Sequence, residues 1–238
     1  MYNIPGAGRD WAMDFIFMLT RGDRTIGDCL ALFELIRPLG LGHVGFKDVG
    51  VDAGTLAALA KAIRASGATT YMEVVSTTPE ACLKSARIAA DLGIDRLLGG
   101  TDAASVLGIL KGTPTKYYPF PGRPQGHPTK LGGTPVEVEA HCRAFVAAGC
   151  AGADLLAYRA TEADPLELVR AARRGLGDRR LIVAGSVTSA RQIADIAGAG
   201  ADAFTIGSAV FDGSYAPDKG SILSQLAAVQ ADCRAIGA

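Results

Sequence analysis

Short apolar runs alternate along this chain with longer segments whose apolar residues recur at a helical spacing. Eight runs have the length and composition of buried strands. They are Phe15–Leu19, His43–Phe46, Thr70–Val75, Arg96–Leu98, Lys116–Phe120, Asp154–Tyr158, Leu181–Ala184 and Ala203–Ile206. Strands that alternate with helices form parallel β-α units. Eight such units within 238 residues predict an α/β fold of the TIM-barrel type, a closed (β/α)8 barrel that occupies residues 1–238 as one domain. An open doubly wound sheet is the competing architecture, but no G-x-G-x-x-G follows the first run.

Helix boundaries support this division of the chain. Thr78 before Pro79 and Asp164 before Pro165 have the pattern of helix starts. The tripeptides that begin at Gly93, Gly152 and Gly200 each end in Asp, at the start of a predicted strand or just before it. We therefore expect each of these glycines to end a helix in the left-handed conformation.

Composition narrows the functional classes. Lys and Arg together number 24, as do Asp and Glu, so charge gives no reason to expect nucleic acid or a membrane surface as a partner. The five cysteines are scattered without C-x-x-C pairs, which fits thiols in a reducing cytoplasm. The N-terminal region lacks a basic segment followed by a long apolar stretch, so we expect no signal peptide and no membrane span.

Two glycine-serine pairs follow the last two predicted strands. Gly185-Ser186 comes after the seventh strand and Gly207-Ser208 after the eighth. Glycine lets the backbone approach a ligand closely, the amides that follow can donate to an anion, and the serines add hydroxyl donors. Barrel enzymes often bind phosphate with these two loops. The alternative is a pair of tight turns without a ligand.

The segment 181–213, LIVAGSVTSARQIADIAGAGADAFTIGSAVFDG, resembles the C-terminal part of the ribulose-phosphate-binding barrel superfamily. That superfamily includes histidine-biosynthesis isomerases, N-acetylmannosamine-6-phosphate epimerases, thiamine-phosphate synthases and tryptophan-pathway barrels. The resemblance implies a small phosphorylated substrate. It leaves the reaction open, because these proteins catalyse isomerisations, epimerisations, decarboxylations and condensations on one scaffold.

Ionisable residues in two neighbouring strands suggest acid–base chemistry. Lys47 and Asp48 end the second strand, and Glu73 lies in the third. A charge in an apolar strand must be paired or belong to a site. A close Lys47–Glu73 pair would have shifted proton affinities, which suits proton transfer, and Asp48 would orient it. The alternative is a structural ion pair in the barrel interior.

The Gly45–Asp48 ending resembles strand two of the N-acetylmannosamine-6-phosphate epimerases, in which the lysine is catalytic. Those enzymes carry a glutamate just before the glycine of the seventh strand, where this chain has Ala184. That departure leaves a second reaction open, in which Lys47 forms a Schiff base with a carbonyl substrate, provided that burial lowers its pKa.

Further cations follow other strands and are candidates for substrate binding. Arg21 follows the first strand and Arg159 the sixth, beside the proposed phosphate site. The long segment 121–134 follows the fifth strand and contains Arg123, His127 and Lys130. Long loops on this side of a barrel are usually functional, so we expect Arg123 and Lys130 to close over the substrate and His127 to act as an acid or base.

The sequence predicts a cytoplasmic enzyme that isomerises or epimerises a small carbohydrate-like phosphate by proton transfer next to a carbonyl. A Schiff-base aldolase, lyase or synthase and a non-catalytic phosphometabolite-binding barrel are the alternatives. No redox cofactor is expected, and no cluster has metal-ligand spacing, although Mg²⁺ that arrives with the substrate phosphate stays open. The sequence does not determine whether the protein forms a homo-oligomer, and Trp11 is a candidate residue for such an interface.

Overall fold

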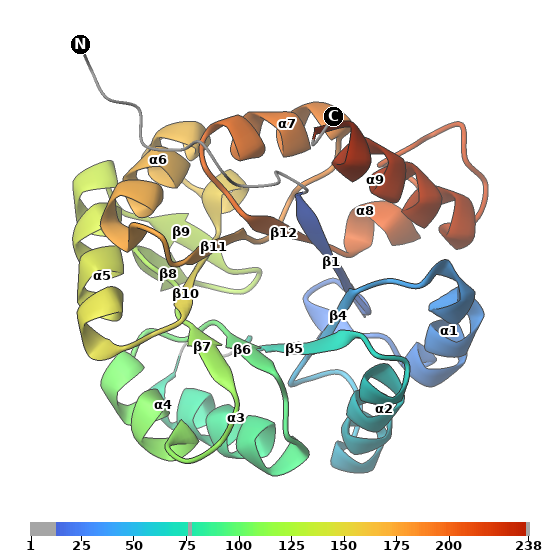
Figure 1. Cartoon of the computed structure of the whole chain (residues 1–238), viewed down its shortest axis with the longest axis horizontal. Helices are drawn as coiled ribbons and strands as arrows, with labels where there is room; N and C mark the ends of the chain where they lie inside the picture. Colours follow the sequence, from blue (N-terminus) through green and yellow to red (C-terminus); the bar gives the residue numbers. More distant parts are fainter. Residues whose placement is uncertain (1–12, 76–77, 237–238) are drawn as a thin grey trace.

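The structure is a computed structural model that describes residues 13–75 and 78–236. Its central feature is an eight-stranded parallel sheet in the order β10-β11-β12-β1-β4-β5-β6-β7. The strands are β1 (Asp14–Met18), β4 (His43–Lys47), β5 (Thr69–Glu73), β6 (Arg96–Leu98), β7 (Lys116–Tyr118), β10 (Gly152–Leu155), β11 (Arg180–Val183) and β12 (Ala203–Ile206). The sheet curls into a ring (Figure 1). Two backbone hydrogen bonds of 3.0 Å, from Ala151 N to Tyr117 O and from Asp154 N to Pro119 O, join β7 to β10. The predicted (β/α)8 barrel is therefore confirmed.

Helices surround the ring (Figure 1). They are α1 (Cys29–Ile36), α2 (Ala53–Ala65), α3 (Pro79–Leu92), α4 (Ala103–Leu110), α5 (Pro135–Ala148), α6 (Pro165–Leu176), α7 (Ala190–Gly198), α8 (Ser208–Phe211) and α9 (Ile222–Ile236), with short 3-10 helices η1 (Arg37–Leu39) and η2 (Ala157–Arg159). Alternate strand residues face the helices and form one large core cluster. The other strand residues, among them Ile16, Tyr71 and Ile182, fill the inside of the barrel.

The expected helix boundaries agree with the structure except at Gly152 and at Gly200, where Ala199, with φ −83°, ends α7 and Gly200, with φ 105°, follows it. Thr78 and Asp164 each cap a helix through the side chain, and Gly93 ends α3 with φ 61°. Gly152 does not end a helix, because it lies within β10, and Gly149 ends α5 instead. The left-handed glycine that ends α5 is therefore three residues before Gly152. Gly152 is required for a different reason, since a Cβ there would lie 1.8 Å from Arg180 O.

Two small antiparallel hairpins extend from the barrel on the side where the strands end. The first joins β2 (Thr20–Arg21) to β3 (Arg24–Thr25) through a two-residue turn. The second, β8 (Arg123–Gln125) and β9 (Lys130–Gly132), is formed by the long segment after β7. That segment is therefore an ordered hairpin, anchored to the barrel by a bridge from Leu131 to Ala160.

Candidate active site

A cavity of about 230 Å³ lies at the carboxyl ends of the strands. All four predicted phosphate-binding residues, Gly185, Ser186, Gly207 and Ser208, line it. Lys47, Glu73 and Arg159 line the same cavity. The structure thus brings together side chains from the second and third strands of the barrel, a side chain from η2 after the sixth strand, and backbone from the loops after the seventh and eighth.

The loop after β11 has an unusual backbone. Gly185 and Ser186 both have positive φ, 75° and 62°. A positive φ is uncommon for any residue other than glycine and is often retained at functional positions. In the part of the chain that the structure describes, the amides of Ser186 and Val187 make no hydrogen bond. Two donors next to the cavity are therefore available to an anion.

The loop after β12 is held close to the end of β1. A Cβ on Gly207 would lie 2.9 Å from Thr20 O and 3.1 Å from Met18 O, so a side chain at this position would push the two strands apart. Within the described residues, the amides of Ser208 and Ala209 make no hydrogen bond either. The two glycine-serine loops therefore present free amides and hydroxyls to one cavity.

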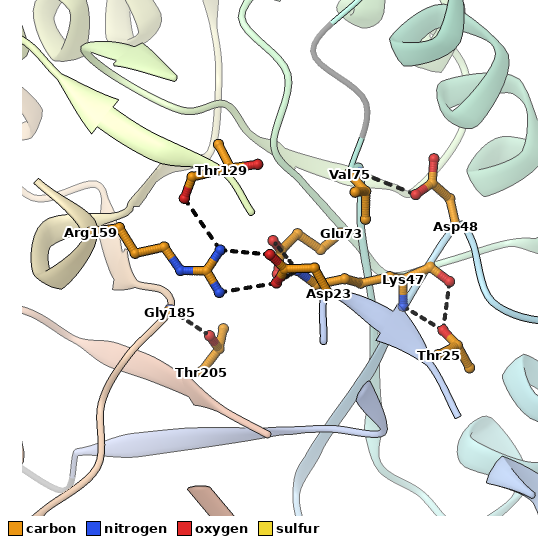
Figure 2. Close-up of polar contacts among 10 residues, drawn as sticks. All are labelled: Asp23, Thr25, Lys47, Asp48, Glu73, Val75, Thr129, Arg159, Gly185 and Thr205. Atoms are coloured by element: carbon orange, nitrogen blue, oxygen red, sulfur yellow. Dashed lines mark hydrogen bonds and ion pairs between the residues drawn. The ribbon is translucent and has the colours of Figure 1, made fainter. Parts of the chain in front are cut away.

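A chain of ion pairs crosses the floor of the cavity (Figure 2). Lys47 Nζ lies 3.0 Å from Glu73 Oε1 and 2.7 Å from Asp23 Oδ1. Lys47 and Glu73 are direct neighbours in the register of β4 and β5, as the sequence predicted. Arg159 then binds Asp23 with two hydrogen bonds, of 2.9 and 3.0 Å. The order of charges is Glu73, Lys47, Asp23, Arg159.

Of the four residues in this series of ion pairs, Asp23 is the one that was not predicted from the sequence. It lies in the turn between β2 and β3, where Gly22 and Asp23 have φ values of 56° and 58°. Two-residue hairpin turns of this kind require positive φ at both positions, and aspartate tolerates it. Burial would raise the pKa of the Asp23 carboxyl, but Arg159 and Lys47 outweigh that effect and hold its pKa well below its usual range. The feature of the sequence that could have indicated this turn is the Gly22-Asp23 pair between two short polar segments.

Lys47 stays protonated in this environment. Its side chain is 7% exposed. Burial by itself would lower the pKa of the ammonium, but the charges of Glu73 and Asp23 outweigh it and raise the pKa above its ordinary value. A Schiff base requires a neutral amine. The condition set for that reaction, a pKa lowered by burial, is therefore not met.

Arg159 reaches the cavity from η2. Its Nε would lie 2.3 Å from a Cβ on Gly185, so the guanidinium packs directly on the glycine-serine loop after β11. Its Nη1 also donates to the carbonyl of Thr129, in the turn of the β8–β9 hairpin, at 3.3 Å. Arg159 thereby connects the hairpin, the loop after β11 and the ion-pair chain.

Asp48 does not orient Lys47. Its carboxylate accepts a hydrogen bond of 3.1 Å from Val75 N and another from the hydroxyl of Ser85 on α3. In Figure 2 it lies beside Val75, away from the ion-pair chain. Successive side chains of a strand point to opposite faces, so Asp48 faces α3 when Lys47 faces the barrel interior. Asp23 occupies the position beside Lys47 that was expected of Asp48.

Four other predicted residues do not line the cavity. His127 and Lys130 are exposed on the β8–β9 hairpin. Arg123 is exposed too, and its guanidinium pairs with Glu137 and Glu162. Arg21 is exposed on β2 and does not line the cavity. Their roles in substrate binding and catalysis stay predictions.

A buried acid lies within the barrel, next to these groups. Asp154 on β10 is 0% exposed, and neither of its carboxyl oxygens has a hydrogen-bond partner. Burial raises the pKa of Asp154 well above its usual value, and the negative charge of Glu73 raises it further. In the sequence, Asp154 opens a predicted strand and carries no signal of a function.

The described residues contain neither a metal cluster nor a membrane-spanning helix. Among the described residues, no three His, Cys, Asp or Glu side chains are grouped to hold a metal ion. No helix in residues 13–75 or 78–236 has both the length and the hydropathy that crossing a bilayer requires. Trp11, the candidate interface residue, lies outside the described residues.

Comparison with known proteins shows the fold. No protein-family model matches the chain, and none of the curated proteins matches it in sequence. Orotidine 5'-phosphate decarboxylase from Pyrococcus horikoshii OT3 has a similar structure, with a TM-score of 0.63 and 11% identity over 92% of this chain and 99% of that chain. The BexX/CysO complex of Amycolatopsis orientalis contains another, with a TM-score of 0.62 and 21% identity over 97% of this chain and 91% of that chain. At these identities the likeness establishes a TIM-barrel fold.

Proposed function

We propose that this protein is an enzyme that binds a small phosphorylated carbonyl compound and moves a proton at the carbon next to the carbonyl. One observation carries the proposal: the two glycine-serine loops and the Lys47–Glu73 pair line a single cavity. A phosphorylated substrate is also consistent with the similarity to an enzyme that is named for orotidine 5'-phosphate. The products are isomers or epimers of the substrate.

The anion-binding part of the proposal rests on free donors. Within the described residues, the amides of Ser186, Val187, Ser208 and Ala209 make no hydrogen bond, and these residues line the cavity, so the amides and the two serine hydroxyls are available to donate to a phosphate. Arg159 adds a positive charge at the same loop, because its Nε lies against Gly185. Backbone amides and a guanidinium are the groups that proteins use to hold phosphate.

The chemical part rests on the ion-pair chain. Lys47 donates a proton to the carbonyl oxygen, and Glu73 accepts the proton from the neighbouring carbon. The electron pair of the broken C–H bond then forms a C=C bond, and the π pair of the carbonyl binds the proton from Lys47, which gives an enediol. Glu73 then returns its proton to the other carbon, or to the other face of the same carbon, while the C=C pair forms the new C–H bond. The O–H pair of one enediol hydroxyl re-forms the carbonyl as Lys47 takes that proton back, which completes isomerisation or epimerisation and restores both residues. Asp23 holds Lys47 in place at 2.7 Å.

Inorganic phosphate is the probe for the anion site. We expect it to bind the wild-type protein in isothermal titration calorimetry and to bind a Ser186→Ala/Ser208→Ala variant at least about 100-fold more weakly, because each of the two lost hydrogen bonds to a charged group contributes about 1.5–3 kcal/mol. Ser105→Ala is the matched control, since Ser105 is exposed on α4 and does not line the cavity. Equal affinity in all three proteins would contradict the anion site.

Exchange in D2O is the test of the reaction. A panel of aldose and ketose phosphates is incubated with the protein, and proton NMR follows the loss of the C–H signal next to the carbonyl. Wild type is expected to exchange at least one compound, and Glu73→Gln is expected not to. Phosphate binding without exchange of any compound would favour the non-catalytic phosphometabolite-binding barrel. A borohydride-stable adduct on Lys47 would instead favour the Schiff-base reaction.

A further inference from the structure

The inference concerns Asp23 and the donors of Arg159 that Asp23 leaves free, and it rests on the anion site of the proposed function. A guanidinium has five N–H donors in one plane. The two on Nη1 go to Asp23 Oδ2, at 2.9 Å, and to Thr129 O, at 3.3 Å. One of the two on Nη2 goes to Asp23 Oδ1, at 3.0 Å. Three of the five donors of Arg159 are therefore in use.

The two remaining donors lie along one edge of the guanidinium. Within the described residues, the N–H of Nε and the second N–H of Nη2 make no hydrogen bond. These two bonds point to the same side of Arg159, and such an edge matches two oxygens of one phosphate group. A Cβ on Gly185 would lie 2.3 Å from Nε, so the edge lies against the loop after β11. In Figure 2, Thr129 and Gly185 lie on opposite sides of the guanidinium.

Asp23 holds this guanidinium and Lys47 at the same time. Its Oδ1 accepts from Arg159 Nη2 at 3.0 Å and from Lys47 Nζ at 2.7 Å, so the two nitrogens cannot lie more than about 6 Å apart. The β2–β3 hairpin that carries Asp23 is attached to β4, because Thr25 Oγ1 accepts from Lys47 N and donates to Lys47 O. The Asp23 side chain is 8% exposed. One buried carboxylate thus sets the spacing between the guanidinium and the proton donor.

We propose that Arg159 binds two oxygens of the substrate phosphate through its Nε–Nη2 edge, and that Asp23 is a positioning residue for both ends of the substrate. The free amides of Ser186 and Val187, in the loop against which this edge lies, bind the same phosphate. Asp23 orients the guanidinium on one side and Lys47 on the other. It thereby fixes the distance from the phosphate to the carbonyl oxygen that Lys47 protonates.

An NMR titration of the wild-type protein with inorganic phosphate tests the free edge directly. The Nε–H signal of Arg159, assigned by through-bond correlation to its backbone, is expected to shift and to exchange more slowly with water, because it gains an acceptor. Arg173 is the internal control, since its Nε already donates to Gly200 O at 2.8 Å and it does not line the cavity. An unchanged Arg159 signal at a phosphate concentration that saturates the protein would overturn the proposal.

Calorimetry measures the contribution of the two-oxygen contact. Arg159→Lys keeps the charge but loses the planar edge, so inorganic phosphate is expected to bind at least about 10-fold more weakly. Arg170→Lys is the matched control, since Arg170 is exposed on α6 and does not line the cavity. Equal affinity in Arg159→Lys and Arg170→Lys would contradict the contact.

Asp23→Asn separates orientation from charge. Asparagine tolerates the positive φ of the turn, but its NH2 group replaces one acceptor of the guanidinium. Removal of a negative charge beside the site would by itself strengthen phosphate binding, whereas loss of the orientation of Arg159 weakens it. We expect phosphate to bind about 10-fold more weakly, which corresponds to one lost hydrogen bond to a charged group. An equal or higher affinity in the folded variant would overturn the positioning role at the phosphate.

The Lys47 end is tested by the pH dependence of turnover. Burial lowers the pKa of Lys47, and the charges of Glu73 and Asp23 raise it. In the C–H exchange assay, the alkaline limb of the kcat profile is therefore expected to move to lower pH in Asp23→Asn. A limb that does not move would show that Asp23 does not act on the proton donor.

The phosphate measurements need no turnover, so this inference and the proposed function fail separately. Phosphate binding that depends on Ser186 and Ser208 but not on Arg159 or Asp23 would overturn the inference and leave the proposed anion site intact. Phosphate binding that depends on Arg159 and Asp23, without exchange of any compound, would support the inference and contradict the proposed reaction. No phosphate binding to the wild type would overturn both.

Discussion

Both ends of the barrel interior contain charged side chains, but the two ends differ in how those charges are compensated. At the amino-terminal end, Arg180 lies 2.5 Å from Asp14, and His43 lies 3.5 Å from the same carboxylate. Tyr71 OH and His43 Nδ1 are 3.2 Å apart. Arg96 stacks over Tyr71 and donates to the hydroxyl of Tyr118. Among the buried side-chain nitrogen and oxygen atoms of this network, Arg180 Nε is the one without a hydrogen-bond partner in the described residues.

The carboxyl-terminal end combines three further features. The two residues other than glycine that have positive φ in the described chain, Asp23 and Ser186, both lie there. Both line the cavity, and the fully buried, unpartnered Asp154 lies on β10, the strand that leads into η2 and Arg159. Buried charge by itself therefore does not identify a site. Three features distinguish a candidate ligand site from a charge network that only stabilises the fold. They are positive φ at residues other than glycine, backbone amides without hydrogen-bond partners, and a buried acid without a partner.

The largest difference between the ends is expected in turnover. Lys47→Met removes the proton donor and should lower C–H exchange by about 10²–10⁴-fold. Arg180→Met, at the amino-terminal end, should lower stability and leave the exchange rate per folded molecule nearly unchanged. A similar loss of turnover in both variants would mean that the two ends are functionally coupled.

The second difference concerns stability as a function of pH. The pKa of Asp154 is raised in the folded state, so its contribution to stability is fully present below the unfolded pKa of about 3.9 and is lost as pH rises toward the folded value. The loss is about 1.4 kcal/mol per pH unit in that window. Asp154→Asn lacks this group, so its stability relative to wild type should rise with pH. Urea denaturation at several pH values measures it, and parallel curves would disprove it.

A third comparison separates backbone strain from crowding at the cavity. Gly185 and Gly112 both have positive φ, 75° and 82°. A Cβ on Gly185 would collide with Arg159, whereas none of the described atoms lies within 4 Å of one on Gly112. Gly112→Ala should cost about 1 kcal/mol, from strain alone. Gly185→Ala should cost about 2–3 kcal/mol and also weaken phosphate binding, because Arg159 must move. Equal costs in thermal unfolding would show that the contact with Arg159 is unimportant.

The smallest effect is expected from Asp14, and its pH dependence has the opposite sign. Burial would raise the pKa of Asp14, but His43 and Arg180 outweigh it and lower the pKa to about 2. This carboxylate therefore stabilises the fold above about pH 4, and the contribution disappears as pH falls toward 2. Because Asp14 is 35% exposed, solvent screening reduces the contribution to about 1 kcal/mol. Asp14→Asn should lose that amount at pH 7 and match wild type near pH 2 in urea denaturation.

The fold could be predicted from the sequence because its signals are local. Two of the eight strands, Arg96–Leu98 and Ala203–Ile206, have the expected bounds, and the other six differ by one to three residues at an end. Apolar alternation and helix caps are properties of neighbouring residues. Gly152 was assigned wrongly because its conformation depends on the approach of Arg180 from the next strand.

The site could be predicted only in part. Lys47, Glu73 and the two glycine-serine loops lie at strand ends, and the topology of a barrel brings strand ends together. Asp23 escaped selection because its importance comes from Arg159, which is 136 residues away in the chain. Asp154 escaped because an acid on a strand becomes exceptional only when every neighbour that could donate a hydrogen bond is absent. Neither the contact between Asp23 and Arg159 nor the lack of donors around Asp154 can be deduced from neighbouring residues in the sequence, because both depend on tertiary packing.

The seam between β7 and β10 has a consequence for how fast Asp154 can exchange its proton with water. Within the described residues, β7 and β10 are joined by two backbone hydrogen bonds and no ladder, and one of the two is donated by the amide of Asp154. Few bonds at one position favour local opening there. Each such opening would admit water to the carboxyl group. Local opening between β7 and β10 would then set the rate at which the Asp154 carboxyl exchanges its proton with the solvent. Early deuterium uptake at the amides of Ala151 and Asp154 would reveal this opening.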